Sequence, residues 1–444
     1  MEPTEPQYST TTKLARIAWL SERDPLKKFD ALMHLFNKES LTACFHELDG
    51  KKAVGYDKVS KDEYGEKLDE NLEVLLEKMK KMAYRPGPVR EVLIPKEGKA
   101  GSFRPLGIGN FEDKLVQKMT AKILESIFEP TFLDCSYGFR PGLGCHDAIR
   151  GLNGYLYTNK VETVIDVDLA NFFGTIGSGL VNDALKQRIN DERFLRYIQR
   201  MFKAGVLSQG ELTISDEGVP QGSPASPILA NIVAHYVIDH WFENTVKKHC
   251  KGKVAIFRYC DDLVICCQYS SDAIRIHKGL GNRLTKYGLK LNEEKTRMVS
   301  FSKEKQDRGI KQESFDFLGF TFFLGKSTKG FVIPKLKTSR KRLISKLKNV
   351  TSWMRANRSR KRLPDLWKTF CSKVRGHVAF YGVSFNQRGV SRFIFAATRI
   401  FFKWLNKRGG RKLLNWDKFN LFMKRNPPPK VIIHHKLFML QTSK

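Results

Sequence analysis

The stretch FRYCDDLVI (residues 257–265) and, earlier in the chain, VIDVDL (residues 164–169) place acidic side chains inside otherwise apolar segments. Removing an ionised Asp from water costs several kcal/mol unless a metal ion or an opposite charge compensates it. The two stretches therefore indicate that both segments converge on bound divalent cations. Such an arrangement is typical of a two-metal site for phosphoryl transfer.

The earlier stretch has the pattern of a strand. Side chains alternate between the faces of a strand, so Asp166 and Asp168 share one face while Ile165 and Val167 point to the other. The alternative for this stretch is a half-buried strand whose two acidic side chains are simply exposed to water.

The later stretch has the pattern of a hairpin. Residues 254–258 and 263–267 are apolar and predict two strands, joined by a tight connection at 259–262. The tip of this hairpin, beside the edge of the earlier strand, can bring Asp168 and Asp261 together. The alternative here is a polar turn without a ligand.

Carboxylate oxygens are hard ligands that suit Mg²⁺, which keeps several waters and takes one or two carboxylates plus substrate phosphates. The sequence predicts two such ions, and Mn²⁺ could take their place. The pair would activate an attacking 3′-hydroxyl and stabilise the leaving pyrophosphate.

Several motifs resemble those of one protein family. Tyr259-Cys260-Asp261-Asp262 is similar to the YxDD signature of reverse transcriptases, and DLANFF (residues 168–173) resembles their preceding acidic motif. Five further stretches, in the expected order, resemble group II intron reverse transcriptases: RPLGI (104–108), CSYGFRPG (135–142), GVPQGSPASPILAN (218–231), LNEEKT (291–296) and FLGF (317–320). The chain is identified as a member of the group II intron-encoded reverse transcriptase/maturase family.

The resemblance implies an α+β fold shaped as a right-hand polymerase. Fingers and a palm with an antiparallel sheet would be followed by a helical thumb, which doubles as the maturase domain X. The implied parts are an N-terminal extension with the start of the fingers (1–88), fingers and palm (89–325), thumb (326–408) and a basic extension that could bind DNA (409–444).

The resemblance also implies roles for single residues. Asp168, Asp261 and Asp262 would be catalytic, and these three together with Leu169 would hold the metal ions. The remaining assignments fall into two groups. Lys96, Arg104, Phe172 and Gln221 would bind the dNTP, and Tyr259, Lys295 and Arg375 would contact primer or template.

Each of these further assignments has an alternative. Phe172 would block a ribose 2′-hydroxyl while Phe173 faces the core, but both rings could be core residues. Lys96 and Arg104 could clamp a triphosphate, yet either residue alone is more often a surface charge. Lys295 could equally be a surface lysine at a helix end.

Positive charge is concentrated at the end of the chain. The net charge is +32, and residues 321–444 hold 31 Lys and Arg against only Asp365 and Asp417. Such a concentration predicts a surface that binds phosphates without sequence preference. Apolar residues at helical spacing predict helices at about 336–356, 363–382 and 390–406, and we interpret most aromatic residues there as core rather than base-stacking platforms.

The function predicted from these features is an RNA-directed DNA polymerase that uses an RNA template, a DNA or RNA primer and dNTPs. Structured intron RNA and target DNA are further expected partners. Two alternatives are an RNA-binding maturase without polymerase activity and a domesticated reverse transcriptase in host defence or repair. No apolar run is long enough to span a membrane, so a cytoplasmic protein is expected. The eight Cys lack zinc-ligand spacing.

Overall fold

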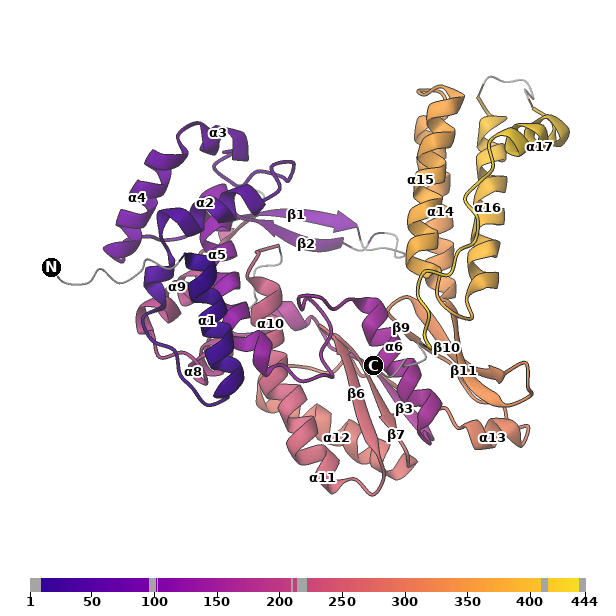
Figure 1. The fold of residues 1–444 in the computed structure, drawn as a ribbon, viewed down its shortest axis with the longest axis horizontal. Helices are drawn as coiled ribbons and strands as arrows, with labels where there is room; N and C mark the ends of the chain where they lie inside the picture. The colour runs from indigo at the N-terminus through magenta and orange to yellow at the C-terminus, as the bar shows by residue number, and fades with distance from the viewer. Residues whose placement is uncertain are drawn as a thin grey trace.

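The computed structural model describes residues 9–95, 101, 103–208, 211–213, 222–408 and 414–438. These residues form a mixed α+β structure with three small sheets and a set of long C-terminal helices (Figure 1). The predicted α+β class is therefore confirmed. The division into four parts at residues 88, 325 and 408 stays a prediction.

The N-terminal part is mostly helical. Its elements are α1 (Thr10–Arg23), η1 (Leu32–Leu35), α2 (Lys38–Glu47), α3 (Lys61–Glu66), α4 (Leu68–Lys80), β1 (Val89–Pro95), β2 (Phe103–Ile108), α5 (Phe111–Phe128) and η2 (Glu129–Thr131). Asn37 caps α2 through a hydrogen bond from the Ser40 N–H, so a new helix begins there rather than continuing from η1.

The middle part holds most of the strands that matter for the site. Its elements are α6 (Cys145–Thr158), β3 (Thr163–Asp168), α7 (Phe172–Thr175), α8 (Ser178–Lys186), α9 (Glu192–Phe202), β4 (Val206–Ser208), β5 (Glu211–Thr213), α10 (Ser226–Ala234), η3 (His235–Asp239), η4 (Phe242–Val246), α11 (Lys247–His249), β6 (Val254–Tyr259), β7 (Asp262–Cys267), α12 (Ser270–Lys286), β8 (Arg297–Ser300) and α13 (Lys303–Asp307). The predicted hairpin is present as β6 and β7, close to its predicted limits.

The central sheet has the order β6-β7-β3-β8 and is antiparallel throughout. Ile165 and Val167 of β3 are buried in a core that includes α10 and α12. Val164 belongs to a second core, on the other face, with α6 and the C-terminal helices. The predicted alternation along β3 is confirmed, and Asp166 and Asp168 therefore lie on the same face as Val164.

The sheet β2-β1-β4-β5 lies on the N-terminal side of the molecule (Figure 1). β1 pairs with β2 as an antiparallel hairpin and with β4 in parallel.

The C-terminal part begins with the small sheet β11-β10-β9 and continues into helices. Its elements are β9 (Phe315–Phe317), β10 (Phe320–Lys326), β11 (Val332–Thr338), α14 (Arg340–Asn357), α15 (Leu363–Tyr381), α16 (Gln387–Leu405) and α17 (Trp416–Arg425). The three predicted helices are confirmed as α14, α15 and α16, except that residues 336–338 end β11 instead of starting a helix. Most of the aromatic residues are core, as predicted, although Phe395 and Trp416 are exposed.

The last described residues run back along these helices. The His434 N–H donates to the Gly382 carbonyl at 2.7 Å, and Val383 forms an isolated bridge with His435. The rings of His435 and His146 of α6 stack with centroids 3.5 Å apart. Residues 426–438 are therefore docked against the C-terminal end of α15 and against α6.

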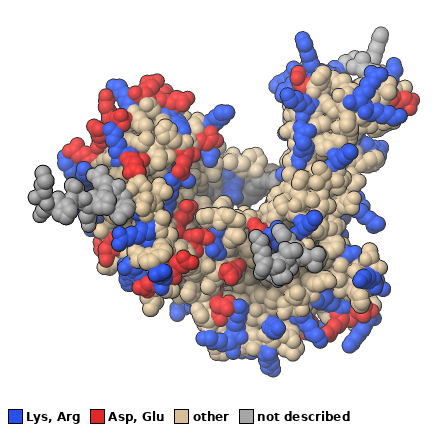
Figure 2. Space-filling model, viewed as in Figure 1, with Lys and Arg blue, Asp and Glu red and all other residues tan. Residues whose placement is uncertain are grey.

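The surface is hollowed between the N-terminal helices and the upright C-terminal helices (Figure 2). Acidic and basic side chains mix on the N-terminal side, whereas Lys and Arg predominate on the C-terminal helices. None of the helices in the described ranges is long and apolar enough to cross a membrane.

Candidate active site

The central sheet brings the three predicted catalytic carboxylates to one end of the β3–β7 pair. Asp168, the last residue of β3, pairs directly with Asp262, the first residue of β7. Side chains directly opposite each other in an antiparallel pair lie on the same face, so these two carboxylates are neighbours. Asp261 lies in the turn just before β7, after Cys260, whose backbone is left-handed with φ of 62°.

A fourth carboxylate lies on the same face one step along β3. Asp166 pairs across the sheet with Val264 on one side and Arg297 on the other. The Arg297 guanidinium lies 3.2 Å from Asp166 Oδ2. Burial nevertheless raises the pKa of Asp166 above its ordinary value, because the opposing effect of Arg297 is smaller than the cost of desolvation.

The carboxylates at this end of the sheet carry negative charge that is incompletely compensated. Burial raises the pKa of Asp262 to about 7, with further contributions from the charges of Asp166 and Asp261. Burial also raises the pKa of Asp261, and the nearby Asp168 adds to the rise while the charge of Arg104 opposes it. A cation bound here would reverse these shifts, because it favours the ionised form of each group.

Asp168 is held in place by residues that follow α12. The Lys295 ammonium and the Asn292 side-chain amide donate to Asp168 Oδ2 at 2.8 and 2.9 Å. The Asn292 N–H donates to the Asp168 carbonyl at 2.9 Å, and the Asp168 N–H donates to Thr296 Oγ1 at 3.3 Å. The LNEEKT motif therefore fixes the end of β3, and Lys295 neutralises part of its charge.

The carboxylates of Asp168, Asp261 and Asp262 offer only oxygen atoms, the ligand type that Mg²⁺ prefers, and the Leu169 carbonyl stays a predicted ligand. Within the described ranges, no three His, Cys, Asp or Glu side chains are grouped closely enough to form a complete protein cage for a metal ion. This geometry still fits Mg²⁺, which usually takes only one or two carboxylates and completes its shell with water and phosphate.

The hairpin tip is supported by a buried ion pair that the sequence reasoning missed. Arg258, in β6, is 0% exposed, and its Nε donates to Asp239 Oδ1 at 2.7 Å; Asp239 is likewise 0% exposed. Arg258 Nη1 also donates to Asn231 Oδ1 at 3.0 Å, and Arg258 Nη2 donates to Ser136 Oγ at 2.7 Å. A charged residue inside an apolar strand was the available signal, as it was for the carboxylates.

A close backbone contact holds the same tip from the other side. A Cβ atom placed on Gly138 would lie 2.5 Å from the Cys260 nitrogen, so only glycine fits there. The Asn231 amide donates to the Gly138 carbonyl at 2.6 Å. Asn231 thus joins the Arg258 ion pair to the glycine that packs against the turn before Asp261.

The turn between β9 and β10 also reaches the carboxylates. The Leu318 N–H donates to the Asp262 carboxylate and lowers its pKa against the larger effect of burial. Leu318 and Gly319 both have left-handed backbones, with φ of 48° and 85°. The FLGF motif is therefore in direct contact with the site.

The predicted nucleotide-binding residues are only partly described. Arg104 is exposed in β2 and lies close enough to Asp261 to lower the pKa of that carboxyl. Lys96 and Gln221 lie outside the described residues. Gly222 has φ of 113°, and a Cβ atom on it would lie 2.3 Å from the Gly107 carbonyl oxygen. Gly222 therefore lies directly against Gly107 of β2.

The structure corrects the prediction for the two aromatic residues after β3. Phe172 is only 2% exposed and belongs to the main hydrophobic core. Phe173 is the partly exposed ring, and it meets Phe172 edge to face with centroids 5.9 Å apart. The prediction that Phe172 faces a bound nucleotide and Phe173 faces the core is wrong, because the left-handed Asn171 (φ 46°) ends the strand alternation before these residues.

The predicted primer and template residues lie at two different places. Tyr259 pairs with Asp262 at the end of the β6–β7 hairpin, and its ring is 6.4 Å from the exposed Phe139 ring. Lys295 contacts Asp168, as described above. Arg375 is exposed on α15, among the C-terminal helices rather than beside the carboxylates.

Residues 94–322 match the family described as "Reverse transcriptase (RNA-dependent DNA polymerase)". This range contains β3, the β6–β7 hairpin and the LNEEKT and FLGF motifs that surround the carboxylates. The chain belongs to the reverse transcriptase family. As a family member it is an RNA-directed DNA polymerase, which acts on nucleic-acid template and primer and on dNTPs.

Similarity to individual proteins supports the same conclusion. The chain is 31% identical to "Protein YkfC" of Escherichia coli (strain K12) over 287 residues, which are 60% of this chain and 74% of that protein. It is 34% identical to "Group II intron-encoded protein LtrA" of Lactococcus lactis subsp. cremoris over 167 residues, 38% of this chain and 27% of that protein. It is 33% identical to "Putative COX1/OXI3 intron 1 protein" of Saccharomyces cerevisiae over 196 residues, which are 43% of this chain and 23% of that protein.

The matched region spans about three quarters of the first of these relatives and about a quarter of the other two. The predicted likeness to group II intron-encoded proteins is thus confirmed. In this reverse transcriptase we call the central sheet with α6, α10 and α12 the palm, and α14, α15 and α16 the thumb.

Proposed function

We propose that this reverse transcriptase copies RNA into cDNA by nucleotidyl transfer at Asp168, Asp261 and Asp262. One observation carries the proposal. Asp168 and Asp262 are direct cross-strand neighbours, and Asp261 lies beside them in a turn whose Cys260 contacts Arg258 and Gly138. The Leu318 N–H donates to the Asp262 carboxylate. Fixed positions for charged groups are what phosphoryl transfer requires of a protein.

The three carboxylates and the Leu169 carbonyl would hold Mg²⁺ or Mn²⁺. When bound, these ions supply the charge that activates the primer 3′-hydroxyl and stabilises the leaving pyrophosphate. Lys295 donates a hydrogen bond to the Asp168 carboxylate. When that carboxylate binds a metal ion, the Lys295 ammonium would be available to contact a primer phosphate. Arg104, whose charge lowers the pKa of Asp261, would bind the triphosphate of the incoming nucleotide. Lys96 and Gln221, which lie outside the described residues, would share this role.

Primer extension on an RNA template with dNTPs and Mg²⁺ tests this proposal. Asp261→Asn removes one ligand charge from the site and should lower the rate roughly 100-fold or more. Asp183→Asn is the matched control, because Asp183 is an exposed carboxylate on α8 outside the site. Equal activity of both variants and the unchanged protein would overturn the proposed site.

Phe173 takes the role that the sequence had assigned to Phe172. Its ring is the partly exposed one and lies five positions after Asp168. Phe173→Ala should therefore increase the use of rNTPs relative to dNTPs. Phe172→Ala should instead destabilise the fold by about 3–5 kcal/mol, because it empties a core position. A gain of rNTP use in the Phe172 variant alone would contradict this assignment.

We also propose that the basic C-terminal part binds structured RNA, as a group II intron-type protein would require for splicing and mobility, and that residues 409–444 add contacts to target DNA. The excess of Lys and Arg after residue 320 supports this proposal. Affinity for a structured RNA, measured at several salt concentrations, should fall steeply with salt. A salt-independent affinity would contradict it.

A further inference from the structure

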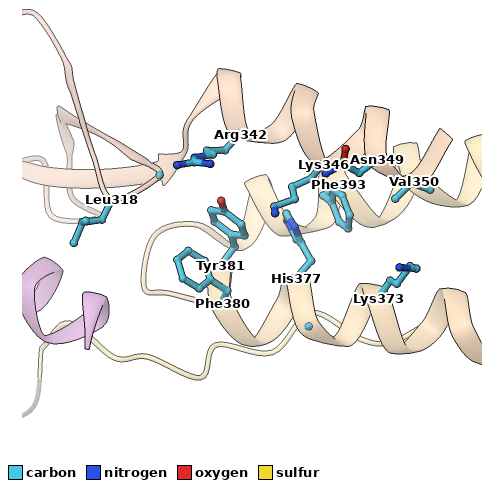
Figure 3. Close-up of a pocket in the computed structure, with 12 residues that line it drawn as sticks. Leu318, Arg342, Lys346, Asn349, Val350, Lys373, His377, Phe380, Tyr381 and Phe393 are labelled. Carbon is cyan, nitrogen blue, oxygen red and sulfur yellow. The ribbon is translucent and has the colours of Figure 1, made fainter. Parts of the chain in front are cut away.

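A groove of about 560 Å³ lies between α14 and α15 of the thumb (Figure 3). α14 and α16 pack against each other, and Phe393 of α16 lines the groove. At one end the groove reaches Leu318 and Gly319, and the Leu318 N–H donates to Asp262. The groove is therefore continuous with the residues that surround the catalytic carboxylates.

Both walls of the groove carry positive charge. Arg342 and Lys346 come from α14, and Lys373 comes from α15. The Lys373 ammonium lies 5.4 Å from the centre of the Trp353 ring on α14, so it reaches across from one helix to the other. No acidic side chain is among the described residues that line the groove. An anionic ligand fits this environment.

His377 is a buried polar residue that lines the same groove. It is 7% exposed, and its ring stacks on Phe393 with centroids 3.5 Å apart. Neither ring nitrogen has a hydrogen-bond partner within the described part of the chain. In Figure 3 the ring points from α15 into the space between the helices, toward Lys346 and Phe393. An unpaired buried polar group destabilises the free protein, and a ligand that supplies the partner removes this cost.

The protonation state of His377 indicates which groups of a ligand can form hydrogen bonds with its ring. Burial lowers the pKa of His377 to about 3, and the charge of Lys346 lowers it further. The ring is therefore neutral at physiological pH and offers one donor and one acceptor. A phosphodiester has no hydrogen to donate, whereas the edge of a base or a ribose hydroxyl can both donate and accept.

Two further side chains give the groove flat apolar surfaces. Phe380, which is partly exposed, and Tyr381 both line it from α15. Aromatic faces of this kind commonly stack on unpaired bases. The size of the groove is also within the roughly 300–1,000 Å³ of ligand pockets in general.

We propose that this groove binds one unpaired nucleotide of the nucleic acid held by the thumb. Its phosphate lies among Arg342, Lys346 and Lys373, and its base or ribose forms hydrogen bonds with His377. The proposal rests on the proposed function only in that the thumb holds nucleic acid. A strand is favoured over a free nucleotide because the groove leads to Leu318 and thus to the carboxylates where the strand is extended.

The test compares neighbouring lysines on α14. Lys346→Gln and Lys348→Gln remove the same charge, but only Lys346 lines the groove, since Lys348 is exposed elsewhere on the helix. The affinity for a short fluorescent single-stranded RNA is measured by anisotropy in EDTA. We expect roughly a tenfold loss for Lys346→Gln, in line with a charge-assisted hydrogen bond, and a much smaller loss for Lys348→Gln. Equal losses would mean a non-specific basic surface and would overturn the proposal.

Variants of His377 test the polar contact. His377→Phe keeps a ring against Phe393 but removes the donor and acceptor, and it should weaken RNA binding by roughly fivefold. His377→Gln, which restores a donor and an acceptor, should recover part of the affinity. If His377→Phe binds RNA as well as the unchanged protein, with a melting temperature that is no lower, the proposal is wrong.

Competition distinguishes a nucleotide in a strand from a free nucleotide. UMP should displace the RNA at a lower concentration than inorganic phosphate does, and the displacement should weaken in the His377→Phe variant. If the variants weaken UMP binding but leave RNA binding unchanged, the occupant is a free nucleotide and the strand assignment fails. Because binding is measured without catalysis, primer extension by the same preparations reports separately on the proposed polymerase site.

Discussion

The palm and the thumb each bury a basic side chain, but only the palm supplies its partners. Arg258 in the palm meets the Asp239 carboxylate, Asn231 and Ser136 with its donors. His377 in the thumb has no partner for either ring nitrogen among the described residues. The difference indicates that the Arg258 network needs no ligand to satisfy its donors, whereas the ring nitrogens of His377 need a ligand to supply their partners.

The physical reason lies in what each region has to do. Nucleotidyl transfer depends on carboxylates whose positions are fixed before substrate arrives, and a fully paired buried network provides this rigidity. A binding groove gains affinity when the ligand satisfies groups that the free protein leaves unpaired.

Asp239→Ala should be the most damaging change, because it leaves the Arg258 charge buried without its partner. We expect a loss of about 3–5 kcal/mol in the free energy of unfolding, measured by urea denaturation. Asp183→Ala, at an exposed carboxylate, is the control and should change stability little. The double variant Asp239→Leu/Arg258→Met should lose less than Asp239→Ala, and a larger loss would contradict this account of the ion pair.

Gly138→Ala should disturb the hairpin tip with a smaller effect on the fold. The added methyl group would lie 2.5 Å from the Cys260 nitrogen and push the turn that carries Asp261. Since a displacement of about 1 Å can cost roughly 100-fold in rate, we expect a loss of that order in primer extension. Gly154→Ala on α6 is the matched control, because nothing lies within 4 Å of its added Cβ. Equal rates for the two variants would show that the contact does not position Asp261.

The contribution of Asp262 to the stability of the metal-free protein should fall as pH rises from about 4 to about 7. The folded state raises the pKa of Asp262 from the ordinary 3.8 to about 7, so within this range the folded protein binds a proton that the unfolded chain has released. Mg²⁺ needs the ionised carboxylate, and its stabilising effect should therefore grow with pH.

Thermal unfolding in EDTA and in MgCl₂, on both sides of pH 7, measures this effect. Asp262→Asn should make the EDTA curves less dependent on pH, because the amide resembles the protonated acid. A magnesium-induced shift in melting temperature that is the same at all pH values would contradict the prediction.

His377→Phe should have the smallest effect on stability, and it should stabilise the fold instead of destabilising it. Replacing a buried group that lacks a partner by an apolar ring of similar shape should raise the free energy of unfolding by about 1 kcal/mol. Urea denaturation without nucleic acid measures the change, and Arg258→Met, which removes a partnered group, should instead destabilise the protein. A loss of stability in His377→Phe would indicate that His377 is a structural residue.

The sequence alone determined the local elements and the chemistry that they carry. Local hydrophobic patterns predict the alternation along VIDVDL, the hairpin around Asp261 and the helices of the thumb. The structure agrees with each of these predictions. The order of the motifs also determined the family. These features could be predicted because burial of apolar side chains at period two or at helical spacing is decided within a short segment.

Which distant groups meet could not be predicted from local patterns. The pairing of Arg258 with Asp239, the contact of Gly138 with Cys260 and the burial of Phe172 instead of Phe173 depend on how separate segments pack. The same holds for His377, whose helix was predicted but whose unpaired ring nitrogens were not. The exposure and the hydrogen-bond partners of a side chain depend on residues that folding brings together from distant parts of the sequence. A local sequence pattern does not specify these residues.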